Sequence, residues 1–405
     1  MKKLIDYLRS PEAIRERCDR IFNLALDDKL PYFRVDLSKL EKCADYVIQV
    51  MRDDYPNLEI PFHSRWRHFE VGNVSRIAEL DAALANFSPL EKAKVKFDLA
   101  IISVLLDAGA GASWQYFEQE TGQVFCRSEG LAVASFRMFV TGAFSSKLNF
   151  LQADAKGLQS LELTALKQGF QINENNLLVG ESGRLKLLQT LGTVLIQKSE
   201  IFGWENPRPG NMVDYLLKQG NQQLRASQVL NAVLTGLGEI WPGRLTIDGV
   251  NLGDVWIHSV LEGTQESDRF IPFHKLSQWL TYSLLEPLQE LGVEITELNQ
   301  LTGLPEYRNG GLCLDMGLLQ LKNSEDLAKT HPVGSELIVE WRALTVSLLD
   351  RIAHTIREKL NLSATELPLV KVLQGGTWNA GRKIALELRT GGIPPIKIDS
   401  DGTVF

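Results

Sequence analysis

Apolar residues recur every three or four positions along most of this 405-residue chain, a spacing that predicts helices. Residues 12–27 place five side chains on one helical face: Ile14, Cys18, Ile21, Phe22 and Ala25. Residues 37–53 follow Asp36, a residue type that caps helix N-termini. Residues 89–107 begin polar and end almost entirely apolar, so we expect that end to be buried. The same periodicity predicts helices over residues 127–140, 155–168, 182–198, 222–236, 272–290, 336–360 and 377–388.

Alternating patterns typical of strands are few, the best being residues 394–405 and, more weakly, residues 122–127. Strands and helices do not alternate regularly, and no internal repeat is evident. The pattern therefore predicts a mainly α fold with a few short strands. We expect one large helical body over residues 1–405, formed either as a single domain or as two lobes of about residues 1–200 and 201–405.

The composition narrows the range of possible functions. The net charge of −7 and the isoelectric point of about 5.6 argue against general affinity for nucleic acid or anionic membranes. The four cysteines have no CxxC spacing, which is typical of reduced thiols and gives no zinc site. The N-terminal segment becomes charged before a signal peptide could develop, and no apolar run reaches the length of a membrane span. We expect a cytoplasmic protein without metal or cofactor, acting on a small molecule.

The tract LLDAGAGASWQY at 105–116 joins a carboxylate to a glycine-rich segment. Asp107 ends an apolar helix, where carbonyl dipoles disfavour a negative charge, so we expect it to have a partner or a chemical role. Gly109 and Gly111 lack the GxGxxG or GxxxxGK[ST] spacing of a nucleotide-binding loop. We interpret the glycines as a break that lets Trp114 fold back over Asp107. An ion-paired structural aspartate is the alternative.

Residues 61–70, PFHSRWRHFE, alternate cations with aromatic rings. His63, Arg65, Trp66 and Arg67 are the residue types that stack on a planar ligand and pair with an anion. The two histidines of this segment are five residues apart, which is not the spacing of a helical metal pair. A cationic surface loop without a ligand is the alternative.

Two more segments mix polar and aromatic residues. In 271–287, one helical face would present His274, Gln278, Thr281 and Tyr282, while Trp279 faces elsewhere. The segment would form either the wall of a polar site or a core helix. In 303–317, Tyr307 and Arg308 precede Asp315, a carboxylate between apolar residues. Partial burial raises the pKa of such a carboxylate unless it is paired, and Arg308 is the candidate partner.

Several strings are similar to a family of bacterial and fungal proteins, and the resemblance runs from about residue 10 to residue 405. The strings are LLDAGAGASWQY, RSEGLAVASF, IPFHKLSQWLTYSLLEP, LTGLPEYRNGGLCLDMG, HPVGSELIVEWRALTVSLLD, GGTWNAGRKIA and SDGTVF. The family is that of the fourth uracil-catabolism protein, or uracil-regulated gene product, of the reductive-independent pathway. LDAGAGASW also resembles helical queuosine-salvage nucleoside glycosidases, which are related in fold to DNA glycosylases.

That pathway opens the uracil ring while the base is attached to ribose, and it ends by degrading urea. The resemblance therefore implies hydrolysis of the N-glycosidic bond of a ribosylurea-type intermediate. Asp107 or Asp315 would stabilise the oxocarbenium-like ribose, and His274 or Glu129 would protonate the leaving nitrogen or position water. Arg65, Arg67 and Arg308 would bind a phosphate if the substrate carries one. The rest of the expected binding set is His63, Trp66, Trp114, Gln278, Trp279, Tyr282 and Tyr307.

Two other functions stay open. Uracil phosphoribosyltransferase-like ribosyl transfer would require pyrophosphate binding and normally Mg²⁺, but the nearest string, TGAFSSK at 141–147, has no acidic pair before it. A non-catalytic protein that binds a pathway intermediate would keep its function when Asp107 and Asp315 become asparagine.

Overall fold

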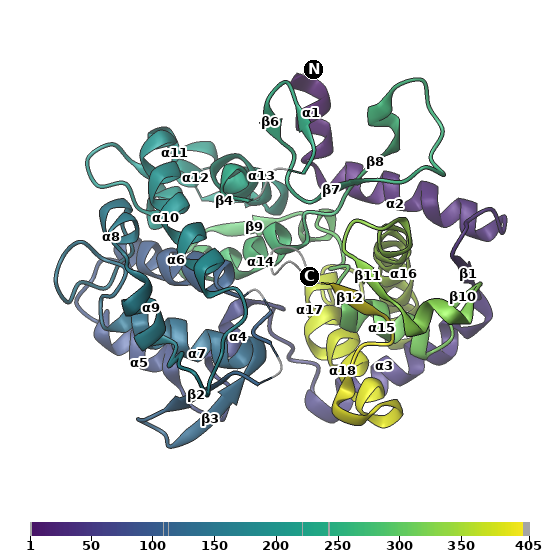
Figure 1. Ribbon diagram of the computed structural model, residues 1–405, viewed down its shortest axis with the longest axis horizontal. Helices are drawn as coiled ribbons and strands as arrows, with labels where there is room; N and C mark the ends of the chain where they lie inside the picture. The colour runs from purple at the N-terminus through teal and green to yellow at the C-terminus, as the bar shows by residue number, and fades with distance from the viewer. Residues whose placement is uncertain (1, 108, 112, 221, 242–243, 400–405) are drawn as a thin grey trace. The chain divides into compact units, whose positions relative to one another are not determined.

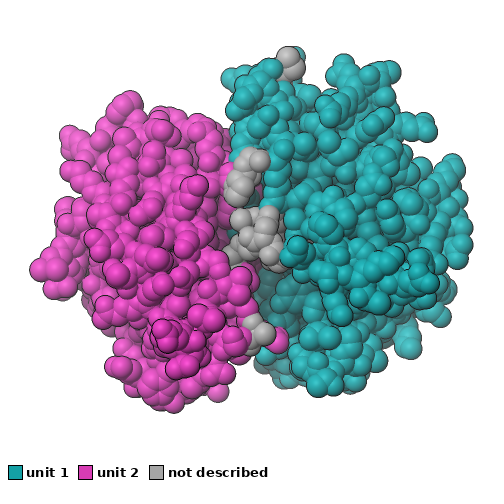
Figure 2. Space-filling view, viewed as in Figure 1, with its two compact units in different colours: residues 1–63, 243–278, 297–405 teal, residues 64–242, 279–296 magenta. Residues whose placement is uncertain are grey.

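The structure is a computed structural model that describes residues 2–399 except 108, 112, 221, 242 and 243. The chain forms two compact units, coloured separately in Figure 2. Unit 1 contains residues 1–63, 243–278 and 297–405, and unit 2 contains residues 64–242 and 279–296. The expected lobes of about residues 1–200 and 201–405 do not follow these boundaries, because segments distant in sequence pack together within each unit.

Unit 1 is built around the long helix α16 (Glu336–Leu360). Residues 337–349 of α16 are all buried, as in a helix surrounded by protein on every side. The helices α2 (Pro11–Leu26) and α3 (Leu40–Asp54) pack against it. The other elements, with η for short 3-10 or π turns, are α1 (Lys2–Leu8), β1 (Phe33–Val35), η1 (Leu37–Lys39), β5 (Thr246–Ile247), β6 (Val250–Asn251), β7 (Val255–Ile257), η4 (Glu266–Arg269), β8 (Phe270–Pro272), η5 (Leu298–Gln300), α15 (Tyr307–Asp315), β10 (Leu319–Leu321), η6 (Ser324–Ala328), β11 (Thr330–Pro332), α17 (Leu369–Val372), η7 (Leu373–Thr377), α18 (Trp378–Leu388), η8 (Thr390–Gly392) and β12 (Lys397–Asp399).

A buried ion pair anchors α16 to the segment before β7. The guanidinium of Arg342 holds both oxygens of Asp254 at 2.8 Å. The indole N–H of Trp256 and the backbone N–H of Lys275 donate to the same carboxylate, at 2.6 and 3.0 Å. Burial would raise the pKa of Asp254, but Arg342 and the other donors keep it well below its usual range.

Unit 2 is built on α6 (Pro89–Leu105) and α7 (Arg127–Val140), which pack against each other. Residues 95–105 of α6 are buried, which confirms the expected change from a polar start to a buried end. The other elements are α4 (Arg65–Phe69), α5 (Arg76–Ala83), β2 (Gln115–Glu118), β3 (Gln123–Cys126), α8 (Ala155–Gln159), α9 (Leu163–Gly169), α10 (Glu181–Gln197), α11 (Ser199–Phe202), η2 (Pro209–Asn211), α12 (Met212–Gly220), β4 (Gln223–Arg225), α13 (Ala226–Leu237), η3 (Gly238–Ile240), β9 (Glu294–Thr296) and most of α14 (Lys275–Glu290).

The prediction of a mainly α fold with short strands is confirmed, and most helices lie where periodicity placed them. The helix expected over 155–168 is instead two helices, α8 and α9, since Asp154 caps a separate start on the N–H of Gly157. The helix expected from residue 222 begins at Ala226, because β4 pairs with β9 first. Of the strand expected over 394–405, β12 covers 397–399, and residues 400–405 lie outside the described residues.

The hairpin of β2 and β3 (Figure 1) has one edge that side-chain amides close. Gln171 accepts a hydrogen bond from the N–H of Phe117 at 2.9 Å and donates to its carbonyl at 2.7 Å. Asn176 does the same for Gln115, at 2.9 and 2.8 Å. Two amide side chains therefore occupy the positions that another strand would take.

A buried carboxylate joins this hairpin to the helices of unit 2. Glu118 accepts hydrogen bonds from Arg76 Nε and Arg137 Nε, each at 2.7 Å, and from the hydroxyl of Thr121 at 2.8 Å. Burial would raise the pKa of Glu118, but these donors lower it to about 2.

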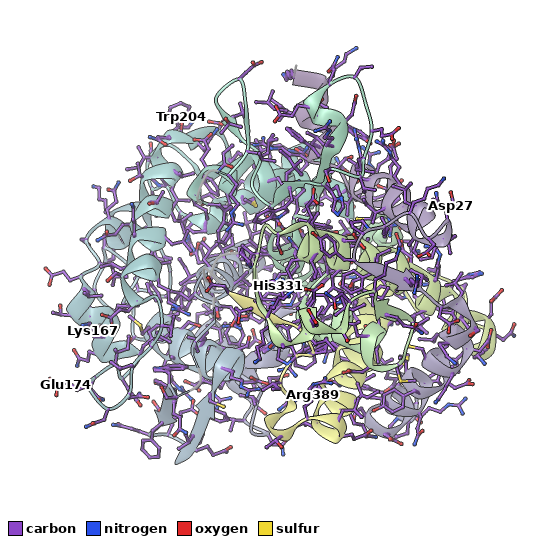
Figure 3. The ribbon with its side chains drawn as sticks, turned by 45° about the vertical axis from the view of Figure 1, so that its right-hand side comes forward. Asp27, Lys167, Glu174, Trp204, His331 and Arg389 are labelled. Carbon is purple, nitrogen blue, oxygen red and sulfur yellow. The ribbon has the colours of Figure 1, made fainter. Side chains whose placement is uncertain are left out.

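The loop 203–210 holds its tryptophan outward. Trp204 is 81% exposed and is labelled in Figure 3, so its indole does not pack into the core of unit 2. Arg208 of the same loop is buried against Asp98, at 2.8 Å from its Nε. Within the described residues, no helix has both the length and the apolar character needed to cross a bilayer.

Candidate functional site

Asp107 lies in the turn after α6, where two side chains hold its carboxylate. Its backbone N–H donates to the carbonyl of Val104 at 3.0 Å, which fixes the turn. The hydroxyl of Ser128, at the start of α7, lies 2.7 Å from both carboxylate oxygens and donates to the carboxylate. Arg65 Nη1 lies 3.1 Å from Oδ1. The side chain of Asp107 is still 13% exposed, so it is partnered and yet reachable.

A chain of hydrogen bonds with one possible direction fixes Arg65. Its Nε donates to the hydroxyl of Ser103 at 2.7 Å. Ser135 donates its own hydrogen to the carbonyl of Ala132 at 2.9 Å, so it accepts from Ser103, whose oxygen lies 2.7 Å away. The guanidinium at one end and the carbonyl at the other therefore orient both hydroxyls.

One donor of Arg65 remains available. Its Nη2 is buried and has no hydrogen-bond partner among the described residues. The guanidinium carbon lies 5.6 Å from the ring centroid of Trp279 and 5.9 Å from that of Phe69. Burial lowers the pKa of Arg65, and the charge of Asp107 opposes that effect. A buried donor of this kind is costly unless something outside the chain accepts its hydrogen bond.

Arg184, on α10, holds the backbone on either side of Asp107. Its Nε donates to the carbonyl of Leu106 and its Nη2 to that of Gly109, each at 3.1 Å, while Nη1 donates to Val179. Burial lowers the pKa of Arg184 to about 10, and the charge of Asp107 opposes that effect. A cation at the end of α6 satisfies carbonyls that the helix leaves open and offsets their dipoles.

Glu129 is the second carboxylate of this cluster. It follows Ser128 in the first turn of α7 and is half-buried. Its negative charge raises the pKa of Arg65, as the charge of Asp107 does. Two of the four expected catalytic residues, Asp107 and Glu129, therefore interact with one guanidinium. We call Arg65, Asp107, Ser128, Glu129 and Arg184 the Asp107 cluster.

Asp315, the other expected carboxylate at the sugar, has a different environment in unit 1. Arg389, labelled in Figure 3, holds its two oxygens at 2.8 and 2.6 Å. The side chain of Asp315 is 6% exposed. Arg308 is therefore not its partner, contrary to the prediction, because the chain after α18 returns to α15 and brings Arg389 there.

His274 is also held within unit 1. Its Nε2 lies 2.9 Å from the carbonyl of Leu8, to which it donates because a carbonyl only accepts. The histidine is buried, and burial lowers its pKa, so it stays neutral near pH 7. It precedes α14 with a φ of 47°, so it does not share a helical face with Gln278 and Tyr282 as expected.

The other expected site residues of that segment, Gln278, Trp279 and Tyr282, are buried. Within unit 1, Gln278 donates to Thr302 Oγ1 at 2.6 Å and accepts a hydrogen bond from the backbone N–H of Thr302 at 2.8 Å. Tyr282 is fully buried. Trp279 packs under Arg65 and meets the ring of His68 edge-on, with 5.5 Å between centroids.

Three more expected binding residues have internal contacts in unit 2. Trp66 donates to the carbonyl of Ser283 at 2.7 Å, and Arg67 pairs with Glu286 at 3.0 Å. Trp114 is buried and donates to the carbonyl of Phe170 at 3.0 Å, an anchor that fixes the chain before β2.

A second group of expected residues meets in unit 1. The guanidinium carbon of Arg308 lies 4.6 Å from the ring centroid of Trp378 and 5.5 Å from that of Tyr307. The ring of His63 lies 5.7 Å from that of Trp378, and its Nδ1 donates to Gln374 at 2.9 Å. We call this group the Arg308 cluster.

Sequence reasoning missed Ser128, Arg184, Trp378 and Gln374. Ser128 directly precedes Glu129, and Trp378 lies in the quoted string GGTWNAGR, so both were visible without an assigned role. Arg184 is one arginine of an ordinary amphipathic helix, and nothing local distinguishes it. Among the described residues, no group of three or more His, Cys, Asp or Glu is arranged to hold a metal ion.

Comparison with known proteins identifies the family. The sequence model of a family described as "Protein of unknown function (DUF1688)" matches residues 7–405. The chain is 40% identical over 438 aligned positions to "Uracil catabolism protein 4" of Lachancea kluyveri, with 99% of each chain covered. It is 41% identical over 409 positions to "Protein urg3" of Schizosaccharomyces pombe, with 98% of each covered. The chain therefore belongs to the DUF1688 family, the uracil-catabolism family that its sequence strings resemble.

Proposed function

We propose that this protein is an N-glycosidase of uracil catabolism, which hydrolyses a ribosylurea-type intermediate to urea and ribose or ribose phosphate. The relative named for uracil catabolism supports the pathway. The Asp107 cluster supports the reaction, because it holds the carboxylate of Asp107 in place and leaves it partly exposed. A cytoplasmic setting, in which the four free cysteines stay reduced, belongs to the proposal.

The carboxylate of Asp107 is the observation that carries the assignment. A carboxylate has about four lone-pair positions, and Ser128 and Arg65 use only part of them. The exposed part of Asp107 is available to a sugar or to water. Asp315 is less suitable, since Arg389 takes both of its oxygens and its side chain is nearly buried.

The reaction balances with water as the only co-reactant. The C–N bond to urea breaks as positive charge develops at the anomeric carbon, and the nearby carboxylate of Asp107 stabilises that charge. A water oxygen forms the new bond to this carbon and loses a proton to Glu129, which replaces the proton that Glu129 gives to the leaving nitrogen. The leaving nitrogen gains a proton, which Glu129 delivers directly or through water. Arg65 Nη2, which is buried and unpaired, would donate to any substrate oxygen that reaches it.

The test is urea release by the purified protein from ribosylurea and from its 5′-phosphate, in EDTA. We expect release from the wild type and a loss in Asp107→Asn of about 100-fold or more, the usual contribution of a positioned acid–base group. Asp315→Asn is the matched control, because it also changes an arginine-paired carboxylate to an amide and should keep its activity. Ser128→Ala, which leaves the ion pair with Arg65 in place, should reduce kcat.

Three results would count against the proposal. Release that survives in Asp107→Asn but disappears in Asp315→Asn would move the chemistry to Asp315. Turnover that needs pyrophosphate and Mg²⁺ would favour ribosyl transfer. Tight binding of ribosylurea without any urea, with or without Mg²⁺, would favour a binding protein of the pathway. Circular dichroism of each variant separates loss of chemistry from loss of fold.

A further inference from the structure

We propose that unit 1 carries a binding site for the phosphate group of a small phosphate monoester, formed by the guanidinium of Arg308 and the rings that flank it. The choice of a sugar phosphate as ligand rests on the proposed function. The anion site itself does not, because it follows from how Arg308 is held.

Arg308 differs from the other two arginines expected to bind phosphate. Arg65 pairs with Asp107 at 3.1 Å, and Arg67 pairs with Glu286 at 3.0 Å. The guanidinium of Arg308 makes no hydrogen bond and no ion pair with any described residue, and it contacts the rings of Tyr307 and Trp378. Its five N–H donors therefore remain open to an oxyanion.

The aromatic contacts hold this guanidinium in place without using its donors. The guanidinium carbon lies over the rings of Trp378 and Tyr307, at 4.6 and 5.5 Å from their centroids, and these cation–π contacts involve no hydrogen bond. A planar guanidinium fixed in this way presents a fork that binds two oxygens of one phosphate. Arg308 is half-buried, so the fork is reachable.

The fold brings Trp378 to this position through glycine. α15 and α18 lie side by side (Figure 1), and a Cβ at Gly381 would come within 2.2 Å of the carbonyl oxygen of Arg308. Gly381 therefore lets α18 approach the first turn of α15, and Trp378, one turn earlier, reaches the guanidinium. The π turn η7 directly precedes Trp378, and its Gln374 holds His63, whose ring lies 5.7 Å from that of Trp378.

One carboxylate lies near this site. Glu306 caps α15 by accepting the backbone N–H groups of Arg308 and Asn309, at 2.8 and 2.6 Å. Burial raises the pKa of Glu306, and the two N–H groups oppose that effect. Because Glu306 is occupied by the backbone and forms no ion pair with Arg308 within the described structure, it does not take the place of the ligand.

The test is isothermal titration calorimetry of the full-length protein with ribose 5-phosphate, ribose and inorganic phosphate. We expect ribose 5-phosphate to bind more tightly than phosphate, and ribose alone not to bind detectably. Arg308→Ala should lower the affinity for ribose 5-phosphate by about 10-fold to 100-fold, the range for charge-assisted hydrogen bonds. Arg308→Lys keeps the charge but loses the fork, so it should also weaken binding. Arg52→Ala, at an exposed arginine of α3, is the matched control and should bind normally.

The proposal is overturned if the wild type does not bind ribose 5-phosphate, if ribose binds equally well, or if Arg308→Ala and Arg52→Ala behave alike. Binding of inorganic phosphate with equal affinity would keep the anion site but overturn the sugar phosphate as its ligand. The two proposals fail independently. Asp107→Asn should lose urea release and still bind ribose 5-phosphate, whereas a wild type that releases urea but does not bind ribose 5-phosphate would remove only the phosphate site.

Discussion

Arg65 Nη1 and Asp107 Oδ1 lie 3.1 Å apart, and the rest of the Asp107 cluster is arranged around that pair. α4 supplies the guanidinium, and the turn after α6 supplies the carboxylate. Ser128 touches both groups, at 3.2 Å from Nη1 and 2.7 Å from the carboxylate. A change to any one of the three is therefore felt by the other two.

Ser103→Ala should destabilise unit 2 and disturb Arg65. The substitution leaves Arg65 Nε buried without its acceptor, which costs about 1–3 kcal/mol. We expect a lower midpoint of guanidinium chloride unfolding and a lower kcat for urea release. Ser113→Ala, at an exposed serine, should leave both unchanged. A Ser103→Ala protein as stable as the wild type would show that Nε does not need this bond.

Acid should remove the stabilisation that Glu118 gives unit 2. Its pKa is about 2 in the folded protein and near 4.5 unfolded, so the contribution is complete above pH 4.5 and lost as pH falls toward 2. The shift corresponds to a few kcal/mol, about 1.4 kcal/mol per pKa unit. Glu118→Gln should be less stable than wild type at pH 6 and approach it near pH 2.5, by chemical unfolding. If the difference in stability between Glu118→Gln and the wild type does not depend on pH, the charge of Glu118 is not its cause.

Gln171→Ala should expose one edge of the hairpin at a single residue. Hydrogen exchange of the Phe117 amide should become faster, since Gln171 is its acceptor, while that of Gln115 stays slow. Asn176→Ala should give the reverse pattern. Equal acceleration at both amides in either variant would mean that the edge opens as one unit.

Gly381→Ala should separate α18 from α15. The added methyl would lie 2.2 Å from the carbonyl oxygen of Arg308, so α18 must move and Trp378 with it. We expect a lower melting temperature and weaker binding of ribose 5-phosphate. Gly183→Ala is the control, because a Cβ there meets nothing within 4 Å in α10, and alanine should raise helix stability by up to about 1 kcal/mol. Unchanged binding of ribose 5-phosphate in Gly381→Ala would show that the phosphate site does not depend on this helix contact.

The sequence pattern predicted the helices better than it predicted which side chains contact one another. The polar start and apolar end of residues 89–107 indicated which part of α6 is buried, because burial is a property of the helix itself. The break between α8 and α9 was missed, since the cap at Asp154 and the close approach of Gly157 to Phe144 depend on tertiary contacts.

The candidate site shows the same limit. The position of Asp107 at a helix end indicated a need for a partner, and the structure provides Arg65, Ser128 and Arg184. The predicted partner of Asp315 was wrong. Arg308 is near Asp315 in sequence, but Arg389 contacts it in the structure. Contacts between residues far apart in sequence have no signature in one chain.

The discontinuous units also bear on how the chain is synthesised. Unit 2 gains its last segment, residues 279–296, only after part of unit 1 has been made, and α2 and α3 must wait for α16 before they can be covered. The apolar faces of these N-terminal helices therefore leave the ribosome long before their packing partner exists. No single cut in the gene would yield either unit whole, and chaperone dependence during translation is the expected cost of this topology.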